Sequence, residues 1–292
     1  MARPGAAPDG TDRTDRLTAP AQATDLARYY DLDLETDPGD VALYLALAGR
    51  AGGPVLELAA GTGRLAVPLA TAGFEVTALD IDGAMLARAQ AAWHGARPGR
   101  RRPGGAFRCL EQDLLSADLG ARFGLVLLAL NSLFLLETAE RQGAAIGAMA
   151  RHLRPGGLAA VDVWLPDADE LAGYDGRLAL EWERADGETG ERVAKLASAR
   201  YDPATMVVEL TTWFDAWPSA GGALRRTART DRLRLVSATE LVRMFGAAGL
   251  EVETLAGDYA LTPFGPGADR AVVIARRPSS ETSPGRPAGP LV

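Results

Sequence analysis

The chain has 292 residues, of which 47% are hydrophobic and 24% charged, enough to bury the core of one large α/β domain or two small ones. Its net charge of −7 argues against a nucleic-acid or anionic-membrane surface, which needs clustered basic residues. The single cysteine, Cys109, excludes an internal disulfide, and the first ten residues contain no apolar signal segment. We therefore expect a cytoplasmic protein with no nucleic-acid or membrane partner.

The two ends of the chain are rich in Pro, Gly, Asp and Thr, which predicts disordered tails at residues 1–21 and 278–292. A short basic run, Arg100 to Arg102, is expected in a solvated loop. The longest apolar stretch, residues 125–136, is interrupted by Asn131 and Ser132 and is shorter than the ~20 residues of a membrane-spanning helix.

Helical spacing begins near Thr24 and again at Asp40, where Asp40 is expected to cap a helix that Gly49 ends. From residue 54 onward, short apolar runs typical of buried strands alternate with helical patterns. The predicted strands are 54–58, 74–80, 106–113, 123–130 and 157–164, and the predicted helices are 63–72, 82–94 and 138–152. This alternation predicts a doubly wound parallel sheet.

The pattern changes after Trp164, because residues 178–236 carry β-branched and aromatic residues with turn dipeptides and no helical period. We expect an antiparallel insert there. Ser237 to Glu240 form a capping-box sequence before a helix that Gly249 ends, and two closing strands are expected to pair antiparallel. The predicted fold is thus a Rossmann-like seven-stranded, mostly parallel sheet, built from residues 22–177 and 237–277.

The sequence LELAAGTGRLA, residues 56–66, is a strand that breaks into glycines and resumes as a helix. Such a turn presents backbone N–H groups and the positive end of a helix dipole at the edge of the sheet where α/β proteins bind ligands. Gly61 and Gly63 are expected to let a ligand approach the backbone closely. Asp80, at the end of the second strand, is placed to accept hydrogen bonds from ribose hydroxyls.

These features also satisfy the dinucleotide fingerprint, so an NAD(P)-dependent oxidoreductase is one alternative. Three observations favour a cationic adenosine ligand instead. Glu57 lies in the first strand, where it would repel a pyrophosphate and attract a positive charge. Asp113 follows the third strand and offers an acceptor to an adenine amino group, and the only lysine, Lys195, falls in the insert rather than in a Tyr-x-x-x-Lys pair.

The segments VLELAAGTGR, VTALDIDGAML, CLEQDLL, LVLLALNSL and HLRPGGLAAVDVW resemble, in order, the motifs of class I S-adenosylmethionine (SAM)-dependent methyltransferases. The resemblance runs from about Tyr29 to Arg276 and includes bacterial N- or O-methyltransferases that act on amino sugars and other natural products. One departure is Ala59, which stands where the family usually has the first glycine of its turn.

The resemblance implies a role for each matching residue toward SAM. The residues implied around the amino-acid end of SAM are Glu57, Ala59, Gly61 and Gly63, and Asp80 is implied on the ribose. The residues implied against the adenine are Ile81, Met85, Asp113 and Leu114, and Leu130 is implied beside the sulfonium. The product implied is S-adenosylhomocysteine.

Methyl transfer from a sulfonium is an in-line displacement that requires alignment and exclusion of water, and no metal. An oxygen nucleophile needs a base, whereas an amine has only to arrive unprotonated. His94 and His152 both end helices, a placement that indicates structural roles. Candidates for contact with the acceptor or for a base are Tyr29, Tyr30, Asn131, Asp162, Trp164 and Tyr259, each with a packing or backbone-satisfying alternative.

The insert carries five aromatic residues, Trp182, Tyr201, Trp213, Phe214 and Trp217, and is expected to cover this edge of the sheet, to form a homodimer interface, or both. An acidic protein with a covered pocket favours a small-molecule acceptor. The predicted function is methyl transfer to N or O of such an acceptor in bacterial secondary metabolism, with a weak preference for nitrogen. A SAM-binding regulator without turnover is the second alternative.

Overall fold

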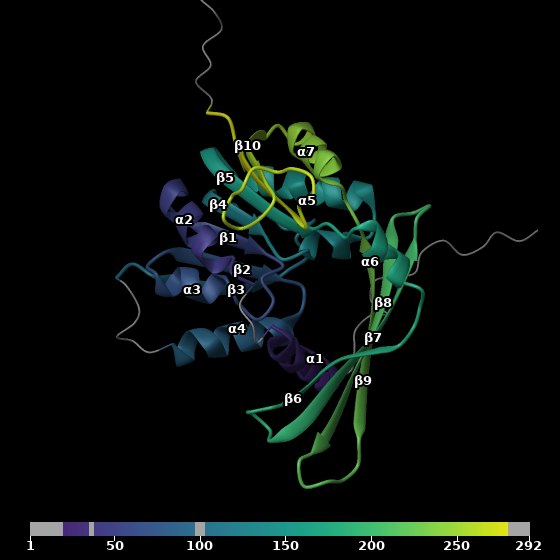
Figure 1. The fold of residues 1–292 in the computed structure, drawn as a ribbon. Coiled ribbons are helices and arrows are strands. Elements are labelled where there is room, and N and C mark those ends of the chain that lie inside the picture. The colour runs from purple at the N-terminus through teal and green to yellow at the C-terminus, as the bar shows by residue number, and fades with distance from the viewer. Residues whose placement is uncertain (1–19, 35–37, 97–102, 280–292) are drawn as a thin grey trace, which may run out of the picture.

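The computed structural model describes residues 20–34, 38–96 and 103–279. Its centre is a seven-stranded sheet with strand order β10-β11-β5-β4-β1-β2-β3 (Figure 1). These strands are β1 (Val55–Leu58), β2 (Glu75–Asp80), β3 (Ala106–Glu111), β4 (Phe123–Leu128), β5 (Leu153–Trp164), β10 (Glu251–Ala256) and β11 (Arg270–Arg276). The first five are mutually parallel, and β11 is antiparallel to both β5 and β10. The predicted fold class and the antiparallel closing pair are confirmed.

Helices cover both faces of this sheet because alternate residues of each buried strand point to opposite sides. On one side, Leu125 and Leu127 pack with α2 (Val41–Ala51), α3 (Ala66–Thr71) and α4 (Gly83–Gly95). On the other, Val126 and Leu128 pack with α5 (Ala139–His152) and α7 (Ala238–Ala247). Two separate apolar cores result, as expected for a doubly wound sheet.

A second sheet follows the short helix α6 (Ala168–Gly173) and has the order β6-β7-β8-β9, all antiparallel. Its strands are β6 (Ala179–Ala185), β7 (Glu191–Asp202), β8 (Val207–Pro218) and β9 (Arg225–Arg234). Helix α1 (Pro20–Asp33) lies between this sheet and α4 (Figure 1). Tyr29 of α1 stacks on Phe214 of β8 with ring centroids 4.9 Å apart, which fixes the helix to the second sheet.

Several predicted element ends differ from the structure. Helix α2 continues through Gly49 and ends at Gly52, whose φ of 62° supplies the left-handed turn that stops a helix. Asp40 precedes α2 but makes no capping hydrogen bond, because its carboxylate is bound to Arg64. The helix predicted from residue 63 begins at Ala66, since the glycine turn occupies the residues before it.

The capping box predicted before α7 is only half formed. Ser237 accepts from the Glu240 backbone N–H at 3.2 Å, but the Glu240 carboxylate pairs with Arg234. Gly249 follows the helix with φ 73°, which confirms it as the stop. The predicted tails lie outside the described residues, except that Pro20 and Ala21 begin α1 and residues 278–279 are described. The basic run at 100–102 also lies outside them.

Candidate active site

The glycine turn is attached to the end of the neighbouring strand β2. The Gly61 N–H donates to Asp80 Oδ2 at 2.8 Å, and the Ala60 N–H donates to the Leu79 carbonyl at 3.0 Å. Asp80 Oδ1 accepts from the Asp82 N–H at 2.9 Å, and Asp82 in turn caps α4. Asp80 therefore holds the turn, the end of β2 and the start of α4 in one arrangement.

Burial raises the pKa of Asp80, while the N–H groups of Asp82 and Gly61 oppose that increase by favouring the carboxylate. Each Asp80 carboxylate oxygen accepts one of these backbone hydrogen bonds and has a further lone pair. The geometry thus leaves room for the two ribose hydroxyls that the sequence resemblance places here.

Replacing Asp80 by alanine is expected to weaken SAM binding by about 1–3 kcal/mol, because the ribose hydrogen bonds and the support of the turn are lost together. Calorimetric titration measures the change. Asp118→Ala, at an exposed position after β3, is the matched control and should bind SAM as the wild type does. Equal affinity of the two variants would remove Asp80 from the site.

Glu57 is a buried carboxyl group at the turn with unused hydrogen-bonding capacity. Its residue is 5% exposed, and its Oε2 has no hydrogen-bond partner among the described residues. Burial raises the pKa of Glu57 to about 8, although Arg64 and the Ala66 N–H act in the opposite direction. A buried carboxylate needs a donor or a cation, and the α-ammonium of SAM supplies both.

The two glycines of the turn are needed for different reasons. A Cβ on Gly61 would meet only the Tyr30 ring, at 3.7 Å. A side chain at this position is unfavourable because the backbone φ is 55°, a conformation that favours glycine. A Cβ on Gly63 would lie 2.9 Å from the Ala89 Cβ and 3.0 Å from Val67. Glycine is therefore required at position 63 for packing of the turn against α4, and the approach of a ligand to its backbone stays a prediction.

Ala59 adopts φ 52°, a left-handed conformation that costs an L-residue about 1–2 kcal/mol. Ala59→Gly is expected to raise the free energy of unfolding by about 0.5–1 kcal/mol, because relief of this strain exceeds the backbone entropy that glycine adds. Urea denaturation measures it. Ala60→Gly is the control, because Ala60 lacks a positive φ and should only lose stability; a destabilised Ala59→Gly protein would refute the strain argument.

Tyr30 lies over the turn from α1, within the electrostatic reach of Glu57, Asp80 and Arg64. Burial raises the pKa of Tyr30 to about 12, so its hydroxyl is a hydrogen-bond donor at neutral pH and not a ready base. Sequence reasoning did not identify Arg64 as a residue of this site. Arg64 donates to both carboxylate oxygens of Asp40, at 2.6 and 2.7 Å. The Arg64 guanidinium, next to Glu57, would lie near the carboxylate of a bound methionine group.

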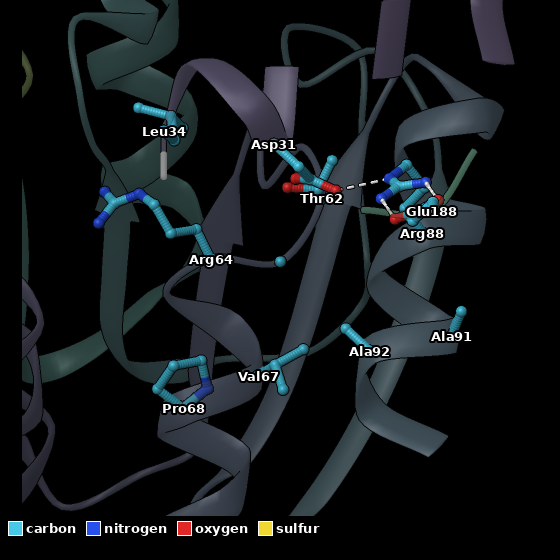
Figure 2. Close-up of a pocket in the computed structure, with 11 residues that line it drawn as sticks. Asp31, Leu34, Thr62, Arg64, Val67, Pro68, Arg88, Ala91, Ala92 and Glu188 are labelled. Atoms are coloured by element: carbon cyan, nitrogen blue, oxygen red, sulfur yellow. Dashed lines mark hydrogen bonds and ion pairs between the residues drawn. The ribbon is translucent and has the colours of Figure 1, made fainter. Parts of the chain in front are cut away.

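A cavity of about 570 Å³ opens on the outer side of the turn, between α3, α4 and α1 (Figure 2). Arg88 lines it and pairs with Asp31 of α1 and Glu188 of the β6–β7 hairpin, at 2.5 Å each. These ion pairs join α1 and the insert to α4. Thr62, Gly63 and Arg64 also line the cavity, which therefore borders the glycine turn.

The predicted adenine contacts lie where β2 and β3 end. Ile81 is 58% exposed, an unusual position for a large apolar side chain, whereas Met85 is buried in α4. Asp113 accepts from the Leu115 N–H at 3.0 Å, and Leu114 is half-buried between them. An exposed Ile81 beside this turn is a suitable surface for an adenine ring.

The exit from β4 contains two consecutive non-glycine residues in the left-handed region, Leu130 (φ 51°) and Asn131 (φ 64°). Asn131 Oδ1 accepts from the Trp164 N–H at 2.6 Å, so its side chain is occupied by backbone. The structure therefore favours a positioning role for Asn131 over the catalytic role considered from the sequence.

Asp162 is fully buried and accepts four hydrogen bonds. These come from the Tyr44 hydroxyl (2.5 Å), the Leu130 N–H (2.9 Å), the Tyr259 hydroxyl (2.9 Å) and Arg270 Nη1 (2.7 Å). Burial raises the pKa of Tyr259, and the Asp162 charge raises it further. Asp162 and Tyr259 are thus bound to each other, and the catalytic roles considered for them stay predictions.

Four other residues considered from the sequence have structural or surface positions. Tyr29 is buried against the second sheet, and the Trp164 ring lies 6.3 Å from that of Tyr174. His152 is buried, with Nδ1 2.8 Å from the Ala148 carbonyl and Nε2 accepting from the Leu119 N–H, while His94 is exposed at the end of α4. Neither histidine extends from a strand end, and the described residues contain no cluster of three potential metal ligands.

The architecture and site define a Rossmann-like protein with two carboxyl groups, Glu57 and Asp80, at the ends of β1 and β2. Residues 55–157 match the family model described as a methyltransferase domain. A relative from Streptomyces venezuelae, dTDP-3-amino-3,4,6-trideoxy-alpha-D-glucopyranose N,N-dimethyltransferase, is 28% identical over 242 residues, covering 80% of this chain and 93% of that protein. The cypemycin N-terminal methyltransferase of a Streptomyces species is 27% identical, covering 77% and 84%.

Among solved structures, the CcbJ methyltransferase from Streptomyces caelestis superposes with a TM-score of 0.66 at 26% identity, covering 83% of this chain and 91% of that one. The chain thus carries a class I SAM-dependent methyltransferase domain, and the resemblance, the enzyme class and the cofactor inferred from its motifs are confirmed. When bound, SAM supplies an electrophilic methyl group on its sulfonium. No helix in the described part of the chain has the length and hydrophobicity needed to span a membrane.

Proposed function

We propose that the protein methylates the nitrogen of a small amine-bearing metabolite in bacterial secondary metabolism. The observation that carries this choice is the state of the polar groups at the ends of β4 and β5. Asn131 Oδ1 accepts from the Trp164 N–H, and Asp162 accepts from Tyr259 and Arg270, so none of these groups is free to remove a proton from a hydroxyl. An amine brings its own lone pair and needs only alignment with the methyl group.

The residues of the chain would act by binding and orientation. Glu57 and Arg64 would hold the amino-acid end of the cofactor, and Asp80 the ribose. The turn at Leu130 and Asn131, fixed by Asp162, would form the wall beside the reacting centre. The relatives support the choice of nitrogen, since their names specify an amino-sugar nucleotide and a peptide N-terminus.

We propose the second sheet, residues 178–236, as the cover that keeps water from this edge. Arg88 connects its β6–β7 hairpin to α4, and Lys195 and Trp182 both bind Asp33 of α1. The homodimer and the cytoplasmic location expected from the sequence also remain proposals. Leu178, which precedes β6, and Leu180, on β6, are exposed and offer an apolar contact for a dimer. Light scattering of the purified chain tests whether it is dimeric.

The proposed function is tested with three acceptors and SAM, following S-adenosylhomocysteine release and product mass. The acceptors are dTDP-3-amino-3,4,6-trideoxy-α-D-glucopyranose, a short peptide with a free N-terminus, and dTDP-glucose, which has a hydroxyl in place of the amine. We expect mass gains of one or two methyl groups on an amine and none on dTDP-glucose. Methylation of dTDP-glucose alone would contradict the choice of nitrogen.

A further inference from the structure

Strand β9 presents one face to the core, and its two ends are fixed to different elements. Near its start, Gln22 of α1 donates to the Ala228 carbonyl at 3.2 Å. At its end, Arg234 binds Gln142 of α5 at 2.6 Å, and Leu233 packs on the apolar core below. Between these points the strand runs from α1 to the short helix η3 (Ser132–Leu136), which directly follows the Leu130–Asn131 turn.

The register between β8 and β9 identifies the side chains on the inward face of the two strands. At one end of this face, Phe214 lies opposite Thr227 and stacks on Tyr29. At the other end, Val208 lies opposite Leu233 and belongs to the apolar core. Between them lie Arg229 and Asp231, joined by two hydrogen bonds of 2.6 and 2.8 Å. A charged pair therefore occupies the middle of a face that is otherwise used for packing.

This pair lies within electrostatic reach of residues beside the glycine turn. Burial opposes the charge on Arg229, but Asp231 raises its pKa, and the neighbouring Asp82 and Tyr30 increase it further. Asp82 follows the ribose carboxylate Asp80, and Tyr30 lies over the glycine turn. The Asp231 side chain is 19% exposed and that of Arg229 36%, so both keep surface that a ligand can reach.

Packing alone gives little reason for the pair. Removing two charges from water is costly, and apolar residues at these positions would extend the contact that Leu233 and Phe214 already make. A carboxylate held by a bidentate guanidinium is a rigid acceptor for N–H and O–H groups, while the remaining guanidinium N–H groups donate to oxygens. Together they match a ring that carries an amine beside hydroxyl groups.

We propose that Arg229 and Asp231 form the acceptor-recognition pair and that they select an acceptor whose amine lies beside a hydroxyl group. This inference rests on the proposed function and specifies its substrate class. Asp231 accepts hydrogen bonds from the amine or the hydroxyl next to it, and Arg229 holds Asp231 and donates to a ring oxygen. The pair positions the acceptor, and it takes no part in the transfer itself.

The test compares KM for dTDP-3-amino-3,4,6-trideoxy-α-D-glucopyranose with Kd for SAM in the full chain. Asp231→Asn is expected to raise KM about 10- to 100-fold and leave SAM affinity unchanged. The double variant Arg229→Asp with Asp231→Arg restores an ion pair but moves the carboxylate, so it should fold and still show the raised KM. Arg232→Gln, on the outward face of the same strand, is the control.

Two results would overturn the recognition role while N-methylation stands. One is an unchanged KM in Asp231→Asn, and the other is a KM restored by the double variant, which would make the pair structural. Methylation of the peptide but not of the amino sugar by the wild type would overturn the substrate class alone. Failure of the wild type to methylate any amine would instead refute the proposed function.

Discussion

Glu57→Gln is expected to weaken SAM binding by about 10- to 100-fold, since a charge-assisted hydrogen bond to the α-ammonium group contributes about 1.5–3 kcal/mol. Glutamine preserves the shape of the side chain and removes only the charge. Glu75→Gln, at the exposed start of β2, is the matched control and should retain full affinity. Calorimetric titration at pH 8 gives both values, and equal affinities would exclude Glu57 from the site.

The same residue predicts a distinctive pH dependence. Its folded-state pKa of about 8 lies above the unfolded value, so between about pH 4.5 and 8 the folded protein without SAM binds more protons than the unfolded chain. The contribution of Glu57 to stability is therefore present at low pH and is lost as pH rises through this window. Glu57→Gln should lose less stability than the wild type over that range, as measured by urea denaturation at each pH.

SAM binding is expected to release the proton that Glu57 holds in the folded protein without SAM. Pairing with the α-ammonium group requires an ionised Glu57, so binding at pH 7 should release up to one proton. The binding enthalpy will then differ between buffers of different ionisation enthalpy. The Glu57→Gln protein should show no such difference, and buffer dependence that persisted in it would assign the proton to another group.

Asp162→Ala is expected to lower the free energy of unfolding by about 3–5 kcal/mol, the usual loss when one partner of a buried ion pair is removed. The change leaves the Arg270 guanidinium and the hydroxyls of Tyr44 and Tyr259 without their acceptor. Asp169→Ala, on the exposed face of α6, should stay close to the wild type. Urea denaturation measures the difference.

A loss below about 1 kcal/mol in Asp162→Ala would contradict the central position given to this carboxylate, because surface-like effects are of that size. The milder Asp162→Asn keeps an acceptor oxygen for the Leu130 N–H. It should therefore fall between alanine and the wild type in stability.

Much of the main sheet could be predicted because its strands are buried runs of apolar residues separated by clear turn residues. The run Phe123–Leu128, for example, is buried at every position, as its sequence suggests. Helix ends were harder, since they depend on single residues. Gly49 and Gly52 look alike in sequence, but only Gly52 adopts the left-handed conformation that ends α2.

The cofactor contacts inferred from the motif lie together at the ends of β1, β2 and β3, because a local strand–turn–helix sequence encodes their positions. Long-range partners carry no such signal. The four donors to Asp162 come from residues 44, 130, 259 and 270, and Asp40 meets Arg64 across a turn and a strand. Sequence spacing indicates none of these pairs.

The inward face of β9 could not be predicted for a different reason. A half-buried strand is normally identified by alternation of apolar and polar residues. In RRTARTDRLR most inward and most outward positions are polar, with Leu233 and Ala228 as the exceptions, so the periodicity gives no orientation. The face becomes clear only from its register with β8, where Phe214 and Val208 mark the buried side.

Calorimetric titration of the full chain with SAM, S-adenosylhomocysteine and NADH tests the account most directly. We expect SAM and S-adenosylhomocysteine to bind, with proton release that depends on Glu57, and NADH not to bind. Binding of NADH without SAM would contradict the account, because the buried Glu57 carboxylate would then face a pyrophosphate and the turn would be a dinucleotide site.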